Sequence, residues 1–127
     1  MQIRLDGRTA FVSGSTRGIG YATARLLAQS GATVVVNGRQ EAAVAQAVAT
    51  LTAEVPEGAF RGVAADIAFP TGAAAVAARE TAFDIVVCNA ATFDWTAFFD
   101  TEDADWQRHF DINVLSGVRL ARQYMQG

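Results

Sequence analysis

The sequence predicts an α/β fold built around a parallel sheet, and three observations lead to that expectation. Short apolar runs alternate along the 127 residues with longer segments whose apolar residues have helical spacing. Two of the short runs are apolar at consecutive positions, which is typical of strands that are covered on both faces. A glycine-rich turn joins the first run to the first helical segment, as in a βαβ unit. This order predicts right-handed crossovers with helices on both faces of the sheet.

Four segments have the composition of strands, and they cover residues 9–14, 33–37, 59–66 and 83–90. The second and fourth carry the uninterrupted apolar runs, whereas the third has the weakest pattern. Helices are expected over residues 19–31, 40–56 and 71–82, and a longer helix should run from Thr101 to the chain end with a bend near Asn113. Thr101 is the expected N-cap of this helix, because acidic residues would then occupy its first turn.

The composition fits one folded domain that spans residues 1–127. Hydrophobic residues make up 51% of the chain and charged residues 18%, which is typical of a globular protein. The net charge of −3 predicts no nucleic-acid partner, and no apolar run reaches the length of a membrane span. Cys88 is the only cysteine, so we expect a cytoplasmic protein in which this thiol is buried in a strand. No metal site is predicted.

The turn VSGSTRGIG, between the first predicted strand and the first predicted helix, is the most informative segment. Its glycines, Gly14, Gly18 and Gly20, would let the backbone turn sharply and approach a ligand closely. A helix that begins at such a turn offers unpaired N–H groups to an anion. A glycine triplet by itself also occurs for purely structural reasons, so its position after an apolar strand is what predicts a pyrophosphate site.

The spacing Gly-x-x-x-Gly-x-Gly resembles the fingerprint of the short-chain dehydrogenase/reductase family, with Ser13 in place of a threonine. Other family motifs follow in order. AADI matches the segment that contacts the adenine ring, CNAA matches the family's Asn-Asn-Ala-Gly, and FDINVLSG carries the catalytic-site asparagine at Asn113. Cys88 and Ala91 depart from the Asn-Asn-Ala-Gly pattern. The resemblance implies a Rossmann-like, doubly wound α/β sheet with strand order 3-2-1-4, in a chain that ends before the fifth strand.

Two arginines decide which nicotinamide cofactor is predicted. The dinucleotide fold typically places an acidic residue after the second strand to hold the ribose 2′-hydroxyl. Gly38 occupies that position, Arg39 follows it, and Arg17 lies in the glycine-rich turn. Each arginine taken singly is equally well explained as a solvated side chain, but the pair is better explained by a phosphate, which favours NADP(H) over NAD(H). The expected cofactor-binding residues are Gly14, Ser15, Arg17, Gly18, Ile19, Gly20, Asn37, Arg39, Asp66, Ile67, Asn89, Ala90 and Ala91.

The resemblance implies hydride transfer between the nicotinamide and a small carbonyl or alcohol substrate, with a serine, a tyrosine, a lysine four residues later and an asparagine as catalytic groups. Asn113 is the only one of the four that this chain supplies, because it contains no lysine and Tyr124 has no residue four positions later. We therefore expect the cofactor-binding portion of an NADP(H)-dependent oxidoreductase, homo-oligomeric at full length, and an inactive 127-residue chain. The alternatives are a non-catalytic nucleotide-binding or interaction module and a truncated, inactive product. Gly127 fits either a natural helix C-cap or an arbitrary cut.

The segment FDWTAFFD is aromatic although it should form a loop. Two interpretations remain open for Phe93, Trp95, Phe98 and Phe99. They line the mouth of a substrate pocket, as the resemblance implies, or they pack the last helix onto the sheet. Trp106 is expected to anchor that helix.

Overall fold

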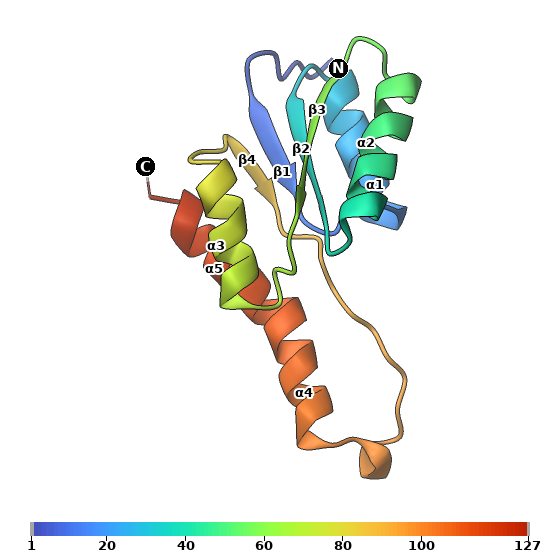
Figure 1. Cartoon of the computed structure of the whole chain (residues 1–127), viewed down its shortest axis with the longest axis vertical. Helices are drawn as coiled ribbons and strands as arrows, with labels where there is room; N and C mark the ends of the chain where they lie inside the picture. The colour runs from blue at the N-terminus through green and yellow to red at the C-terminus, as the bar shows by residue number, and fades with distance from the viewer. Residues whose placement is uncertain (1, 127) are drawn as a thin grey trace.

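The computed structural model describes residues 2–126, which contain a four-stranded parallel sheet (Figure 1). Its strands are β1 (Thr9–Val12), β2 (Thr33–Gly38), β3 (Ala59–Ala64) and β4 (Ile85–Val87). They are arranged in the order β3-β2-β1-β4, and all three neighbouring pairs are parallel. The predicted fold class and strand order are confirmed.

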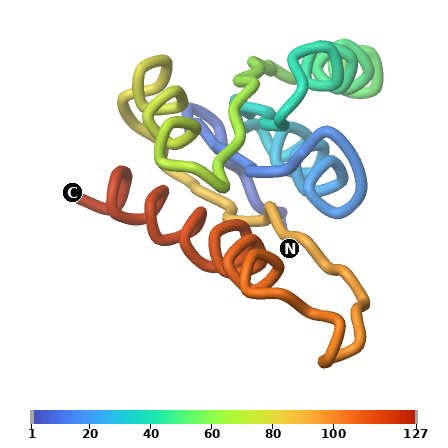
Figure 2. The backbone as a smooth tube through the Cα atoms, turned by 60° about the horizontal axis from the view of Figure 1, so that its bottom comes forward, coloured from blue at the N-terminus to red at the C-terminus, as the bar shows by residue number. Residues whose placement is uncertain are grey.

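Helices cover both faces of this sheet. α1 (Gly18–Gln29) and α2 (Glu41–Glu54) lie on one face, whereas α3 (Pro70–Arg79) and α5 (Ser116–Tyr124) lie on the other (Figures 1 and 2). The chain runs outward from β1 to β3 and then returns to place β4 on the other side of β1. The strand order therefore reverses beside β1, and doubly wound sheets bind ligands at the carboxyl ends of the strands next to such a reversal.

Side chains of the central strands alternate between two apolar layers. The buried layer under α1 and α2 consists of Ala10, Val12, Ala24, Ala28, Ala32, Val34, Val36, Ala47, Leu51 and Val55. The buried layer on the other face consists of Phe11, Val35, Val63, Ala65, Ile67, Val76 and Leu120. β1 and β2 are apolar at consecutive positions because both of their faces are covered. The three residues of β4, at the edge of the sheet, are only half-buried.

Three strands end earlier than the sequence predicts. β1 ends at Val12, β3 at Ala64 and β4 at Val87, because the residues that follow leave the sheet and form loops at its carboxyl edge. The third strand had the weakest sequence pattern, yet it pairs with β2 along its whole length. α3 begins at Pro70, since proline is favoured in the first turn of a helix.

The predicted last helix is divided into three parts: α4 (Asp103–Phe110), a π-helical turn (Asp111–Leu115) and α5. The π-helical turn contains Asn113, the position at which the sequence predicted a bend. Gly127, which fits either a cap or a cut, lies outside the described residues.

The predicted N-cap of the last helix is wrong. Glu102, and not Thr101, caps α4, and it forms a capping box with Asp105. A capping box needs an acidic or amide side chain three residues after the cap. Glu102 has Asp105 at that distance, whereas Thr101 has Ala104.

Residues 88–102 leave the sheet and, together with α4, project away from it in both views (Figures 1 and 2). Cys88 is exposed here rather than buried, because β4 ends before it and lies at the sheet edge. Of the two interpretations of the aromatic segment, packing of the last helix onto the sheet is wrong. The exposed aromatic residues of this region are Phe93, Trp95, Phe98, Phe99, Trp106 and Phe110.

Between residues 2 and 126, no helix combines the length and apolar character that crossing a bilayer requires. The same residues contain no cluster of three or more histidine, cysteine, aspartate or glutamate side chains that could hold a metal ion.

Candidate nucleotide-binding site

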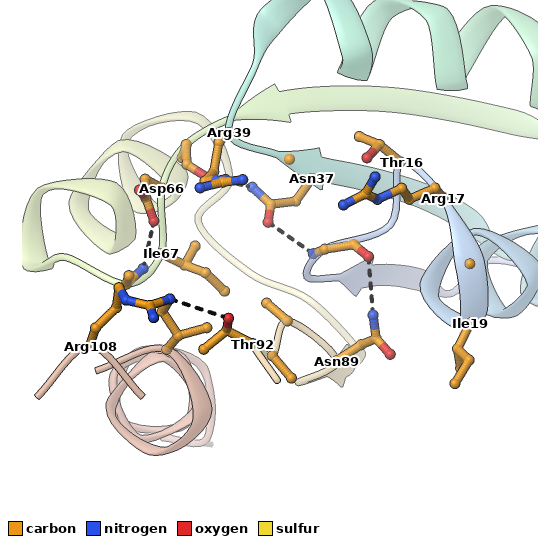
Figure 3. Close-up of a pocket in the computed structure, with 18 residues that line it drawn as sticks. Thr16, Arg17, Ile19, Asn37, Arg39, Asp66, Ile67, Asn89, Thr92 and Arg108 are labelled. Carbon is orange, nitrogen blue, oxygen red and sulfur yellow. Dashed lines mark hydrogen bonds between the residues drawn. The ribbon is translucent and has the colours of Figure 1, made fainter. Parts of the chain in front are cut away.

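The carboxyl ends of the strands border a cavity of about 610 Å³ (Figure 3). Its walls come from the glycine-rich turn, the ends of β2 and β3, the segment after β4, and one face of α4 with its π-helical turn. The lining residues are Gly14, Thr16, Arg17, Gly18, Ile19, Asn37, Gly38, Arg39, Ala65, Asp66, Ile67, Ala68, Asn89, Ala90, Ala91, Thr92, Arg108 and Ile112. This is the position at which the strand order favours a ligand site.

The three glycines of the turn are required either by backbone conformation or by close packing. Gly14 and Gly18 have φ angles of 62° and 63°, in the left-handed region that other residues rarely adopt. A Cβ atom at Gly20 would overlap the carbonyl oxygen of Gly14 and would lie 2.6 Å from Nδ2 of Asn89. In the described structure no side chain caps the N-terminus of α1. Its first N–H groups therefore remain available to an anion in the cavity.

A buried polar network fixes the end of β2 to this turn. The side chain of Asn37 is 1% exposed, and its Oδ1 accepts a 3.2 Å hydrogen bond from the N–H of Gly14. Its Nδ2 donates to the carbonyl oxygens of Val63 and Ala65, at 3.1 and 3.2 Å. The buried Ser15 hydroxyl accepts from the N–H of Asn37 at 2.9 Å. Because buried polar groups are destabilising unless they are paired, these bonds hold β1, β2 and β3 in register at the cavity.

A second network ties the turn to the segment after β4. The hydroxyl oxygen of Ser13 accepts hydrogen bonds from the N–H groups of Asn89 and Ala90, both at 2.9 Å. Asn89 Nδ2 donates in return to the carbonyl oxygens of Ser13 and Gly14, at 3.2 and 3.1 Å. The hydroxyl of Ser13 therefore fixes where the chain leaves β4.

The wall at the end of β2 carries two arginines. Arg17 and Arg39 lie on either side of Asn37 in Figure 3, and both residues are exposed. Neither guanidinium forms an ion pair with another residue between positions 2 and 126. Gly38 separates Asn37 from Arg39, so this position offers no carboxylate. Planar guanidinium groups without a carboxylate partner match phosphate oxygens.

The end of β3 leads into a turn that is fixed from three sides. Oδ1 of Asp66 accepts the N–H of Ala68 at 3.1 Å, and Arg119 of α5 donates to the carbonyl oxygen of Ala68 at 3.0 Å. Gly72 of α3 packs against the carbonyl group of Asp66 so closely that a Cβ atom there would overlap it. Ile67 is buried in this turn and lines the cavity.

The wall from α4 holds the segment after β4 in place. Asn113 does not line the cavity, because its Oδ1 accepts the N–H of Thr92 at 2.8 Å and its Nδ2 donates to Thr92 O at 3.0 Å. Arg108, one helical turn before Ile112, lines the cavity and donates to Asp94 and to the Thr92 hydroxyl. The hydrogen bond from Arg108 holds the pKa of the Asp94 carboxyl below its ordinary value.

Of the residues predicted to bind the cofactor, all but Ser15 and Gly20 line the cavity. Those two are buried: the Ser15 hydroxyl bonds to Asn37, and Gly20 packs against the carbonyl oxygen of Gly14. The lining residues that the sequence analysis missed are Thr16, Gly38, Ala65, Ala68, Thr92, Arg108 and Ile112. Arg108 and Ile112 had a usable signal, since a spacing of four places them on one helix face. Gly38 was identified only as the position without an acidic residue, and Thr16 only as part of the glycine-rich turn. No local pattern indicated Ala65, Ala68 or Thr92.

The strand order and the cavity at the reversal point define a doubly wound α/β protein with a nucleotide-type site. The short chain dehydrogenase family matches residues 8–127, and the chain belongs to this family. It is 39% identical over 125 residues to the uncharacterized oxidoreductase YvaG of Bacillus subtilis, covering 98% of this chain and 47% of that protein. It is 30% identical over 126 residues to a 3-oxoacyl-[acyl-carrier-protein] reductase of Aquifex aeolicus, with 97% and 50% covered.

Solved structures also superimpose closely on this chain. L-sorbose reductase from Gluconobacter frateurii, complexed with NADPH and L-sorbose, superimposes with a TM-score of 0.90 at 32% identity, covering 98% of this chain and 49% of the reductase. The NADP complex of Pseudomonas aeruginosa RhlG gives a TM-score of 0.85 at 30% identity, with 98% and 49% covered. The chain spans about half the length of the relatives that it matches, and it corresponds to the N-terminal, cofactor-binding region of the family.

The residues present fit a phosphorylated dinucleotide. A Cβ atom does not fit at Gly20, and the start of α1 is uncapped. Both arginines at the end of β2 lack a carboxylate partner among residues 2–126. Each of these features favours an anionic group that approaches the backbone closely.

Proposed function

We propose that this chain is the cofactor-binding portion of a cytoplasmic, NADP(H)-dependent oxidoreductase that interconverts a small carbonyl compound and an alcohol. One observation carries the choice of cofactor: Arg17 and Arg39 flank the end of β2, where glycine replaces the acidic residue that would bind a ribose 2′-hydroxyl. Membership of the short chain dehydrogenase family supports the oxidoreductase class. The NADPH and NADP complexes of L-sorbose reductase and RhlG support the cofactor class.

In this proposal each wall of the cavity binds one part of the cofactor. The N–H groups at the start of α1 bind the pyrophosphate, and Arg17 and Arg39 bind the 2′-phosphate. Asp66 and Ile67 contact the adenine ring. The ribose next to the nicotinamide is contacted by Asn89, Ala90 and Ala91. When bound, the cofactor supplies or accepts the hydride.

Catalysis needs groups that this sequence does not contain. There is no lysine among the 127 residues, so the proton-transfer pair that the family resemblance implies would come from outside them. Asn113 remains a proposed member of the catalytic site, and its side chain contributes by positioning Thr92 beside the cavity. The 127-residue chain alone is expected to be inactive. Homo-oligomer formation by the full-length protein is part of the same proposal.

Titration calorimetry with NADP⁺ and NAD⁺ tests the cofactor assignment. We expect NADP⁺ to bind about tenfold or more tightly than NAD⁺, because only NADP⁺ offers a phosphate to the two arginines. Arg39→Ala should weaken NADP⁺ binding by about 10- to 100-fold and leave NAD⁺ binding nearly unchanged.

Arg122→Ala is the matched control, because Arg122 is an exposed arginine of α5 that does not line the cavity. It should change neither affinity. Equal affinities of the wild-type protein for the two nucleotides, or an equal loss of both in Arg39→Ala, would contradict the assignment to NADP(H).

A further inference from the structure

Position 38 carries a glycine although its backbone does not require one, since Gly38 is not among the glycines with positive φ. The reason for the glycine is space. A Cβ atom built on Gly38 would lie 2.5 Å from Cγ2 of Thr16 and 3.3 Å from Cγ2 of Val44. Carbon atoms in favourable contact are about 3.5–4.0 Å apart, so the methyl group of Thr16 occupies the place of a side chain at position 38.

Thr16 cannot move away as a unit, because the residue before it is fixed. The N–H of Ser15 donates to the carbonyl oxygen of Asn37 at 2.8 Å, and the buried Ser15 hydroxyl donates to Val12 O at 2.6 Å. Only rotation about the Cα–Cβ bond of Thr16 could make room at position 38. A β-branched side chain has few favourable rotamers, so this rotation is restricted.

We propose that this contact between Thr16 and Gly38 is a steric determinant of cofactor choice, acting together with the two arginines. Sites that prefer NAD(H) place an acidic side chain after the second strand, where it binds the ribose 2′-hydroxyl. The Thr16 methyl group keeps such a side chain out and leaves the 2′ position to Arg17 and Arg39. The inference rests on the proposed function, because it concerns the same cofactor site.

If the contact has this role, the two positions must be coupled. Gly38→Asp alone adds a carboxylate that repels the 2′-phosphate, but its Cβ meets Thr16, so the carboxylate does not reach the geometry that binds a ribose hydroxyl. Thr16→Ser removes the Cγ2 methyl group and keeps the hydroxyl. The double substitution should therefore accept the acidic side chain where neither single substitution does.

Calorimetry with NADP⁺ and NAD⁺ on the wild-type protein, Gly38→Asp, Thr16→Ser and the double variant forms a complete cycle. We expect NAD⁺ affinity to change less than about twofold in each single variant and to rise about tenfold or more in the double variant. If Gly38→Asp alone gains as much NAD⁺ affinity as the double variant, the steric role of Thr16 is wrong. A wild-type protein that binds neither nucleotide would instead overturn the proposed function, and the inference with it.

A second pair of variants, in which only a methyl group is added at position 38, tests the contact without a new charge if Gly38→Asp does not fold. Gly38→Ala should lower the melting temperature by about 4 °C or more, and adding Thr16→Ser should restore most of that loss. Gly117→Ala is the control, because a Cβ there meets only Cys88, at 3.6–3.7 Å. An unchanged melting temperature in Gly38→Ala would show that Thr16 does not occupy the space, which would also overturn the inference.

Discussion

The glycine-rich turn and the ends of β2 and β3 form one wall of the cavity, and buried, paired polar groups hold this wall in place. The second wall, lined by Thr92, Arg108 and Ile112, belongs to residues 92–113, which leave aromatic side chains in solvent. In the first wall, Asn37 is 1% exposed and binds the backbone of three segments. In the segment that carries the second wall, Trp95 is 87% exposed and Phe99 is 95% exposed, and neither lines the cavity. Exposed hydrogen bonds of Asn113 and Arg108 hold this second wall.

The difference between the walls shows which part of the site depends only on contacts among the described residues. The buried polar groups that hold the first wall are packed closely, so a change at Asn37 or Ser15 must disturb neighbouring atoms. The segment that carries the second wall has exposed aromatic side chains, whose loss would remove little buried apolar surface. Matched substitutions in the two walls should therefore have very different effects on the free energy of unfolding.

The same substitution at two asparagines, one that holds each wall in place, gives the largest expected contrast. Asn37→Asp replaces an amide that donates to Val63 O and Ala65 O with a buried carboxylate, and we expect a loss of about 3–5 kcal/mol at pH 7. Asn113→Asp removes one exposed hydrogen bond to Thr92 and should cost about 1 kcal/mol or less. Urea unfolding of both variants measures the two losses.

The pH dependence of Asn37→Asp provides its internal check. Burial and two facing carbonyl oxygens would raise the pKa of the introduced carboxyl above its value in the unfolded chain. The destabilisation should therefore be complete above the folded-state pKa and should shrink as the pH falls toward the unfolded-state value. Equal losses for the two aspartate variants would show that the first wall is as hydrated as the second.

Two glycines in helices give the next contrast. Gly72→Ala would push a methyl group into the carbonyl of Asp66 and displace the turn after β3, with an expected loss of about 2–3 kcal/mol. Gly117→Ala meets only Cys88 at ordinary contact distance and should stabilise α5 by up to about 1 kcal/mol, because alanine favours helices. Thermal unfolding should separate the two variants in opposite directions, and a tolerated Gly72→Ala would contradict the tight packing.

The difference between the walls also explains what the sequence could predict. Glycines after an apolar strand, alternating apolar layers and the arginines near β2 are local patterns, and from them the fold and most residues of the first wall followed. The methyl group of Thr16 fills the space beside Gly38, and Arg119 of α5 donates a hydrogen bond to the turn at Ala68. Contacts of this kind join residues far apart in the chain and have no local signature.

Local signals also compete, and the prediction can select the weaker one. Threonine is a common N-cap residue, which favoured Thr101 as the cap. The capping box of Glu102 and Asp105 instead satisfies two backbone N–H groups at once. Cys88 sits in a run with strand composition, yet the edge position of β4 left it exposed. Edge or interior position depends on the whole sheet, and no single strand reveals it.

Arg119 joins α5 to the turn after β3, and its loss should have an intermediate effect. Arg119→Met keeps the aliphatic stem and removes the 3.0 Å hydrogen bond to Ala68 O, at an expected loss of about 1 kcal/mol. NADP⁺ affinity should also fall, because the turn that carries Asp66 loses its tie to α5. Arg122→Met, an exposed arginine of the same helix, should change neither stability nor affinity. Identical results for the two variants would remove Arg119 from the site.

The smallest effect is expected where the side chains are largest. Trp95→Ser and Phe99→Ser remove side chains that are exposed in the fold, so little apolar burial is lost and stability should change by less than about 0.5 kcal/mol. Phe11→Ala, at a buried position of β1, should by contrast cost about 3–5 kcal/mol.

Urea unfolding of these variants at two protein concentrations tests this expectation. A loss above about 1 kcal/mol in Trp95→Ser would mean that the side chain is covered in solution. If that loss grows with protein concentration, a second copy of the protein covers it, since only an intermolecular contact follows mass action.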